Sequence, residues 1–349
     1  MVTVTLADLA YRYRQFLIAV IGAGVVMAMA LLMAGLVGGF GAETNSTIGG
    51  VGADAWVLTN TSAGRVASVS VFPQAVTAVV AHSPGVTRAD PLVILPQQVA
   101  HSGSKLITVN VVGATIGGLG DPQQVSAGRP ISGPGQVVVD SKTGAAVGSV
   151  FTIGTTPFRV VGQITNRSLL GGTYMVYIPL RDAQALGLGG RPIVTAVVTT
   201  GVPTSVPAGL HVFTTSAVEQ RTLAGLASAV SSINNTKILM WVIAGIIIAA
   251  LLYVSALQRV RDFAVLKALG SSTMMLLSSL ALQAVIVALL AAAFAAIISN
   301  FMGGIFQEPV AIPHSAFVAL PIIAIVVGLL SSLVALRQAT GADPAAAFG

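Results

Sequence analysis

Charged residues are scarce in this 349-residue chain, making up 8% of it, whereas hydrophobic residues make up 54%. Soluble domains of ordinary composition carry roughly 25% charged residues. The scarcity therefore favours a membrane protein. Cysteine is absent, which excludes disulfides and thiolate metal sites, so any folded part outside the cytoplasm must be stabilised by its own core.

Recognisable catalytic and nucleotide-binding motifs are also missing. The sequence has no G-x-x-x-x-G-K-[ST] loop, no G-x-S-x-G elbow and no H-E-x-x-H pair, and its histidines are widely scattered. We therefore predict no catalytic residue, no metal site and no cofactor on this chain. An acid pair brought together by folding is the one enzymatic alternative left open.

The net charge of +6 would suggest nucleic acid as a partner if the protein were soluble. The basic residues form no dense patch with interleaved aromatics, and many of them flank hydrophobic stretches. Such flanking charges are explained by the retention of positive residues in the cytoplasm. We predict no nucleic-acid partner.

Four uncharged hydrophobic stretches are long enough to cross a bilayer as helices, which takes about 20 residues. They run from Phe16 to Gly38, Ile238 to Leu257, Met274 to Ile298 and Ser315 to Leu336. The predicted transmembrane helices are residues 16–41, 238–257, 274–298 and 315–336. A secretory signal peptide is the alternative for the first, but its apolar run exceeds the usual roughly 7 to 15 residues and no clear cleavage site follows.

The orientation follows from the basic residues beside these helices, which all fall on one side: Arg12, Arg14, Arg259, Arg261, Lys267 and Arg337. Because positive flanks stay in the cytoplasm, residues 1–15, 258–273 and 337–349 are predicted to be cytoplasmic. Residues 42–237 and 299–314 are then outside. We place the chain in the cytoplasmic (inner) membrane of a bacterium, as a multi-pass protein with both termini in the cytoplasm.

The outside segment, residues 42–215, is rich in glycine, threonine, serine and proline and has short β-branched runs that predict strands. These runs are Leu106–Val112, Gln136–Asp140, Val150–Ile153, Phe158–Ile164, Tyr174–Ile178 and Ile193–Thr199. The sequence GTTP between two of them is typical of a hairpin turn.

Short helices are expected within the same segment at Gln74–Ala81 and at Arg181–Leu186, the second stopped by Gly187. The predicted fold class is therefore a membrane protein with four transmembrane α-helices and a large α+β extracytoplasmic domain inserted between the first and second helices.

A longer helix, residues 216–237, is predicted to follow this domain. Ser216 and Glu219 have the spacing of a capping box, and the apolar residues after them form a heptad-like stripe of Leu223, Leu226, Val230 and Ile233. With no Pro or Gly cluster before Ile238, we expect the helix to continue straight into the second span as a stalk. The alternative is that the stripe packs only on its own domain.

The cytoplasmic segment 258–273 has the pattern of a short amphipathic helix. Its apolar residues recur every third position, at Val260, Phe263, Leu266 and Leu269. Charged residues lie elsewhere on the turn, and Gly270 can end the helix. A membrane-interface helix with snorkelling basic residues would have the same pattern.

This segment resembles a known family. Arg259 to Gly270 is similar to the motif Arg-x-Arg-[Asp/Glu]-x-x-[Val/Leu]-Leu-[Lys/Arg]-Ala-Leu-Gly in the cytoplasmic loop of FtsX/MacB-type ABC transporter permeases. Further segments resemble the MacB-type periplasmic core and the family's usual tail: Gly52–Leu58, Val137–Ile164, Val176–Leu186, Arg337 and Ala342–Ala345. MacB carries its ATPase on the same chain, whereas this chain has no ATPase motif.

The resemblance implies a permease subunit that couples ATP hydrolysis by a separate cytoplasmic ABC ATPase, present in two copies with bound ATP and Mg, to movement of the extracytoplasmic domain. The ATPase-coupling residues would be Arg259, Arg261, Asp262, Phe263, Leu266, Lys267, Leu269 and Gly270. The other expected partners are the lipid bilayer, a second copy of the chain, and an extracytoplasmic protein or substrate.

The role would be export or mechanotransmission in the envelope, and the resemblance leaves the substrate open. A small-solute permease, for example for amino acids, and a non-transporting envelope regulator or receptor are the alternatives. Gly22, Gly24 and Ala28 offer a small-residue face, through which we expect the membrane part to self-associate.

Overall fold

The computed structural model describes residues 13–66, 70–101, 105–169, 171–258, 273–302 and 310–340. The chain divides into two compact units. Met1–Gly39 and Ala229–Gly349 form the helical unit, and Phe40–Ser228 form the sheet unit.

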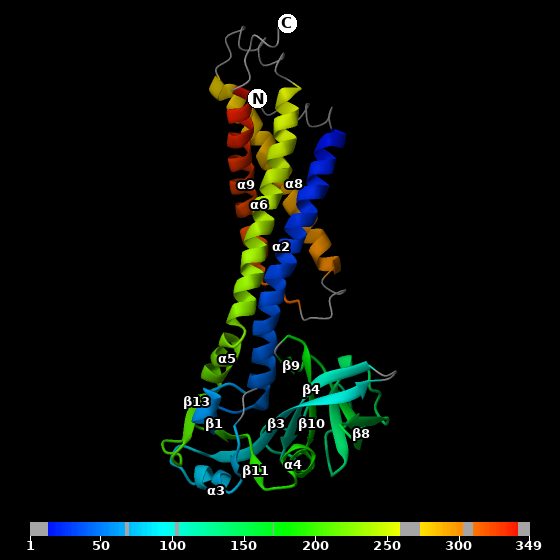
Figure 1. The fold of residues 1–349 in the computed structure, drawn as a ribbon, viewed down its shortest axis with the longest axis vertical. Coiled ribbons are helices and arrows are strands. Elements are labelled where there is room, and N and C mark those ends of the chain that lie inside the picture. The colour runs from blue at the N-terminus through cyan, green and yellow to red at the C-terminus, as the bar shows by residue number, and fades with distance from the viewer. Residues whose placement is uncertain are drawn as a thin grey trace. The chain divides into compact units, whose positions relative to one another are not determined.

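Among the described residues, the helical unit contains the long helices α2 (Tyr13–Ile48), α6 (Ala227–Leu257), α8 (Thr273–Met302) and α9 (His314–Thr340). They run alongside one another in Figure 1. In the described part of the chain, three helical stretches are long and apolar enough to cross a membrane: Tyr13–Val51, Ala227–Ser255 and Ala281–Met302. His314–Leu330 is a shorter apolar helix, so the predicted count of four spans stays a prediction.

Small side chains bring these helices close together. Alanines of α2 and α8 fill the centre of the unit, and Ala23, Ala288 and Ala291 are completely buried. Gly24 lies against α8 so tightly that a Cβ there would be 2.6 Å from Cδ1 of Phe294. Contacts this close between helices need residues without bulky side chains.

The predicted self-association through Gly22, Gly24 and Ala28 stays a prediction, and two of these residues pack within the chain. Gly24 faces Phe294 of the same chain, and Ala28 is 1% exposed. A Cβ on Gly22 would lie 3.8 Å from Ile247 of α6. Gly24 and Ala28 are therefore used for packing within one chain, whereas Gly22 is half-buried.

The sheet unit contains a mixed sheet with the strand order β13-β1-β12-β3-β4-β10-β6-β8-β5. β7 pairs with β3 and β8, β9 pairs with β10, and β11 pairs with β2 in a small second sheet. β10 runs parallel to β4 and β6 runs parallel to β8, while the other paired strands are antiparallel. Together with its helices, this arrangement confirms the α+β class.

The strands are β1 (Ala55–Thr59), β2 (Phe72–Pro73), β3 (Arg88–His101), β4 (Lys105–Ala114), β5 (Ala127–Gly128), β6 (Gln136–Asp140), β7 (Val150–Ile153), β8 (Thr156–Ile164), β9 (Ser168–Leu169), β10 (Thr173–Pro179), β11 (Ile193–Val194), β12 (Ala196–Thr200) and β13 (Leu210–Thr214). The helices of this unit are α3 (Val76–Ala81), α4 (Leu180–Leu188) and α5 (Thr215–Ala224), with 3-10 turns η1 (Gly49–Val51), η2 (Asn60–Ser62) and η3 (Ser141–Thr143).

Both faces of the main sheet are buried. Along β6, Val137 and Val139 point into a cluster covered by α3 and α4, whereas Val138 points into a second cluster on the other face. Ile48 at the end of α2 and Val218 of α5 cover that second face, and Figure 1 shows these helices on opposite sides of the sheet. Burial on two faces explains strands that read as continuous hydrophobic runs.

Most of the predicted strands are confirmed, two of them, β6 and β7, with the predicted bounds. The GTTP turn is confirmed, because β7 and β8 form a hairpin in which Ile153 pairs with Thr156. The run Ile193–Thr199 is divided at Thr195 into β11 and β12. At this break, the Thr195 hydroxyl accepts a hydrogen bond from the backbone N–H of Ile94 at 2.8 Å. This bond connects the residue between β11 and β12 to β3.

Helix α4 does not stop at Gly187 as predicted. It continues to Leu188 and ends at Gly189, which has φ of +63° and so supplies the left-handed cap that favours glycine. Gly187 instead serves close packing, since a Cβ there would lie 2.3 Å from Cδ1 of Leu95 in β3.

Candidate functional site

The first helix is longer than predicted, because α2 continues past Gly38 to Ile48. Its last turns are polar and belong to the sheet unit. Glu43 is 5% exposed there, and its two carboxylate oxygens accept hydrogen bonds from the backbone N–H groups of Gly171 at 3.1 Å and Gly172 at 2.9 Å. A buried carboxylate needs such partners, so this pair of bonds fixes α2 to the loop before β10.

Further hydrogen bonds join the same end of α2 to the neighbouring loop. The Thr47 hydroxyl donates to the backbone oxygen of Ser168, and the Ser46 hydroxyl donates to that of Asn166 at 3.0 Å. The guanidinium of Arg167 donates to the backbone oxygen of Ser46. The end of α2 is thus held by a continuous segment of the sheet unit.

Helix α5 is fixed to the sheet unit at its first residue. The backbone N–H of Thr215 donates to the backbone oxygen of Asp54 at 3.0 Å, and the Thr215 hydroxyl donates to the backbone oxygen of Ala53. The predicted capping box is wrong, because the N-cap is Thr214, whose hydroxyl accepts from the N–H of Ala217 at 3.3 Å. Partial burial raises the pKa of Glu219.

The predicted stalk, residues 216–237, is two helices instead of one. α5 ends at Ala224, Gly225 and Leu226 form a turn, and α6 then runs without a break from Ala227 into the apolar stretch. Glycine is a poor helix former, which explains a break at this position. The four residues of the predicted stripe are all half-buried, and their role in a stalk stays a prediction: Leu223, Leu226, Val230 and Ile233.

The predicted ATPase-coupling residues lie outside the described residues: Arg259, Arg261, Asp262, Phe263, Leu266, Lys267, Leu269 and Gly270. Their role stays a prediction.

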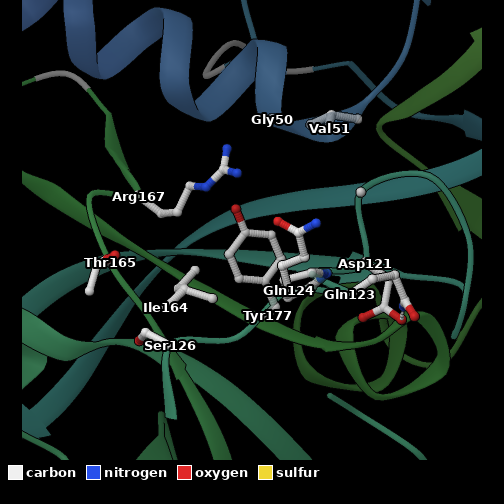
Figure 2. A pocket seen from close by; sticks show the side chains of 12 residues that line it. Gly50, Val51, Asp121, Gln123, Gln124, Ser126, Ile164, Thr165, Arg167 and Tyr177 are labelled. Atoms are coloured by element: carbon white, nitrogen blue, oxygen red, sulfur yellow. Dashed lines mark hydrogen bonds between the residues drawn. The ribbon is translucent and has the colours of Figure 1, made fainter. Parts of the chain in front are cut away.

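The sheet unit also contains a polar pocket of about 390 Å³ that the sequence did not indicate. Figure 2 shows Tyr177 of β10 at its centre, Arg167 on one side, and Asp121 and Gln123 on the other. Gly50 and Val51 of η1, which follows α2 directly, also line it. These residues come from distant parts of the chain, so no local sequence pattern could have brought them together.

The electrostatics of this pocket are set by burial. Burial raises the pKa of Tyr177 to about 12, with Arg167 acting to lower it and Asp140 to raise it. Burial also raises the pKa of Asp121, while hydrogen bonds from Gly117 and Gln123 act in the opposite direction. At neutral pH the Tyr177 hydroxyl is therefore protonated and can donate a hydrogen bond.

Two family models match the chain in succession. One described as the MacB-like periplasmic core domain matches residues 16–209, and one described as the FtsX-like permease C-terminal matches residues 237–344. The first spans more than half of the sequence. The chain belongs to the FtsX/MacB family of ABC transporter permeases. The family resemblance seen in the cytoplasmic motif is thereby confirmed.

Full-length relatives of this permease support the same assignment. The uncharacterized ABC transporter permease Rv2563 of Mycobacterium tuberculosis is 37% identical over 349 residues, covering 100% of this chain and 99% of the relative. The uncharacterized ABC transporter permease Rv0072 of the same organism is 35% identical with the same coverage.

Solved structures similar to this permease include the periplasmic region of MacB from Actinobacillus actinomycetemcomitans, with 11% identity and a TM-score of 0.35, covering 48% of this chain and 91% of that one. The extracellular domain of the noncanonic ABC-type transporter YknZ from Gram-positive bacteria has 12% identity and a TM-score of 0.34, covering 46% and 98%. The family assignment rests on the family models and the full-length relatives.

Proposed function

We propose that this permease transmits the conformational changes of a separate cytoplasmic ABC ATPase to its sheet unit outside the cytoplasm, for export or for mechanical signalling in the envelope. The observation that carries the proposal is the anchoring of α2. This helix is continuous from Tyr13 to Ile48, includes the first apolar span, and is fixed to the sheet unit by the buried carboxylate of Glu43. A displacement of the helix would therefore reach the loop at Gly171 directly.

The working assembly in this proposal is a homodimer of the permease with two ATPase subunits that hold ATP and Mg, in the cytoplasmic (inner) membrane of a bacterium. Each chain crosses the membrane four times, with α9 as the fourth span, and both termini are cytoplasmic. The basic flanks of the apolar stretches support this orientation. α6 exposes apolar residues such as Ile238, Val242 and Ile246, which suit contact with lipid or a second copy.

The orientation can be tested with single cysteines, because the chain has none of its own. Thr155 lies in the exposed β7–β8 turn and Gln258 lies exposed just after α6. In right-side-out membrane vesicles, a membrane-impermeant maleimide should label Thr155→Cys at once and label Gln258→Cys only after the vesicles are opened. The reverse pattern would invert the topology.

Coupling to the ATPase can be tested in the segment that follows α6. If Phe263 and Leu266 insert into an apolar groove of the ATPase, Leu266→Asp should weaken the complex by on the order of 2 kcal/mol, because it places an unpaired charge in an apolar contact. The measurement is co-purification of the ABC ATPase with the full-length permease in detergent, together with ATP hydrolysis by the complex.

The matched control is Lys267→Ala, which removes a charge at the rim of the proposed contact with the ATPase. It should weaken the complex by about 0 to 1 kcal/mol. Both variants should retain the wild-type thermal midpoint. Unchanged ATPase association in a correctly inserted Leu266→Asp variant would mean that the segment is only a membrane-surface element.

A further inference from the structure

The pocket around Tyr177 is formed entirely within the sheet unit. It is lined by η1, the loop between β4 and β5, the end of β8 with the turn after it, and β10. Its volume of about 390 Å³ falls in the range of roughly 300–1,000 Å³ that is usual for small-molecule sites. Its lining includes amide, hydroxyl and charged groups at Asp121, Gln123, Gln124, Ser126, Thr165 and Arg167.

The Tyr177 hydroxyl is available to a ligand. The residue is 5% exposed, and its ring packs in the hydrophobic cluster on that face of the sheet. Figure 2 shows its hydroxyl pointing into the pocket on the side of Arg167, and no side chain or backbone group in the described ranges forms a hydrogen bond with it. Polar atoms of buried side chains are normally hydrogen-bonded, so this donor has room for an acceptor from outside the protein.

Arg167 supplies a positive charge that the chain holds in place. Its backbone N–H donates to Oδ2 of Asp140 at 2.8 Å, and its Nη1 donates to the backbone oxygen of Ser46. No carboxylate pairs with its guanidinium among the residues described, and Figure 2 shows the side chain at the edge of the pocket, on the side toward which the Tyr177 hydroxyl points. A Cβ on Gly50 would occupy the position of the guanidinium, so the glycine gives this side chain its place.

The wall of the pocket opposite Arg167 contains a carboxyl group, that of Asp121, which affects the charge of the ligand that the pocket can bind. Oδ2 of Asp121 accepts from the N–H of Gly117 at 2.8 Å and from Nε2 of Gln123 at 2.7 Å. The lining therefore combines one guanidinium with one carboxyl group. The single guanidinium can pair with one negative charge on a ligand, and a second negative charge would be left unpaired and repelled by Asp121.

We infer that this pocket binds a small solute with one carboxylate group, which Arg167 and Tyr177 hold while the wall at Gln123 and Gln124 contacts the polar remainder. Arginine binds carboxylates in a planar, charge-assisted geometry, and the hydroxyl adds a second donor. Gly50 and Val51 place the bound solute directly beside the end of α2. The site is independent of the coupling to an ATPase proposed above.

The deciding test uses the purified full-length permease in detergent at constant ionic strength. At about pH 8.5, N-acetylglycine carries one carboxylate and one amide, N-acetylglycinamide has no charge, and inorganic phosphate is mainly a dianion because that pH lies above its second pKa. N-acetylglycine should raise the thermal midpoint in proportion to its occupancy and bind at least about tenfold tighter than either comparison compound. Absence of any midpoint change with N-acetylglycine overturns the site, and tighter binding of phosphate overturns the carboxylate assignment.

Three variants locate the binding. Tyr177→Phe keeps the ring and removes only the hydroxyl, so it should keep the ligand-free midpoint and weaken binding about tenfold. Arg167→Gln should remove measurable binding, and Arg159→Gln, an exposed arginine on β8, should bind as the wild type does. Since Arg167→Gln can also loosen the contact with Ser46, Tyr177→Phe decides the question. Wild-type affinity in Tyr177→Phe contradicts the proposal.

Discussion

Replacing Glu43 with alanine is expected to cost about 2 kcal/mol of the free energy of unfolding, because it leaves two partly buried backbone N–H groups without their acceptor. Those groups belong to Gly171 and Gly172, at 3.1 and 2.9 Å from the carboxylate oxygens. The thermal midpoint of the full-length permease should fall, and hydrogen exchange at the two glycine amides should accelerate.

Two further variants separate this contact from general effects on α2. Glu43→Gln keeps one acceptor oxygen but turns an amide donor toward the second N–H, so its midpoint should lie between those of the wild type and the alanine variant. Asn45→Ala changes an exposed residue of the same turn and should leave the midpoint within about 0.5 kcal/mol of the wild type. Unchanged exchange at Gly171 and Gly172 in Glu43→Ala would show that the carboxylate does not fix the loop.

The same variant bears on the proposed transmission. If α2 carries movement to the sheet unit, Glu43→Ala should leave the ATPase bound, because the change is confined to the other end of the helix. ATP hydrolysis would then continue while its effect on the sheet unit is reduced. Leu266→Asp should have the opposite pattern, with the ATPase lost and the sheet unit intact.

The sequence predicted those strands in which a run of β-branched or apolar residues is itself enough to indicate a buried strand. The run QVVVD became β6 because three successive valines can be buried only when both faces of a strand are covered. β3, one of the central strands, was not predicted, because Pro91 and Pro96 lie within it. Proline lowers the expectation of a central strand, yet Pro91 pairs with Val197 and Pro96 with Asn110.

The anchoring of α2 and the pocket depend on contacts that are remote in sequence. The segment around Glu43 is polar and follows an apolar run, which suggested that the helix had ended. It stays helical because its polar groups find partners 120 or more residues away, such as Gly171 and Ser168. Tyr177 and Asp121 likewise line one pocket only because the fold brings their segments together. The spacing of these residues in the sequence does not predict that proximity.

Gly38→Ala is expected to destabilise the helical unit, while Gly41→Ala on the same helix is expected to stabilise the protein. A Cβ on Gly38 would lie 2.3 Å from the backbone oxygen of Ala311 and 3.3 Å from Cδ of Pro313. A backbone oxygen cannot rotate away as a side chain can, so α2 or the segment before α9 must shift. Overpacking of this kind costs about 1–3 kcal/mol.

Gly41 provides a matched control, because a Cβ there meets nothing within 4 Å. Its replacement should stabilise α2 by up to about 1 kcal/mol, through the higher helix propensity of alanine. The thermal midpoints of the two full-length variants in detergent should therefore move in opposite directions from the wild type. Equal shifts would contradict the close contact between α2 and Ala311, which is also supported by the 2.9 Å hydrogen bond from the Ala311 N–H to the Gly35 oxygen.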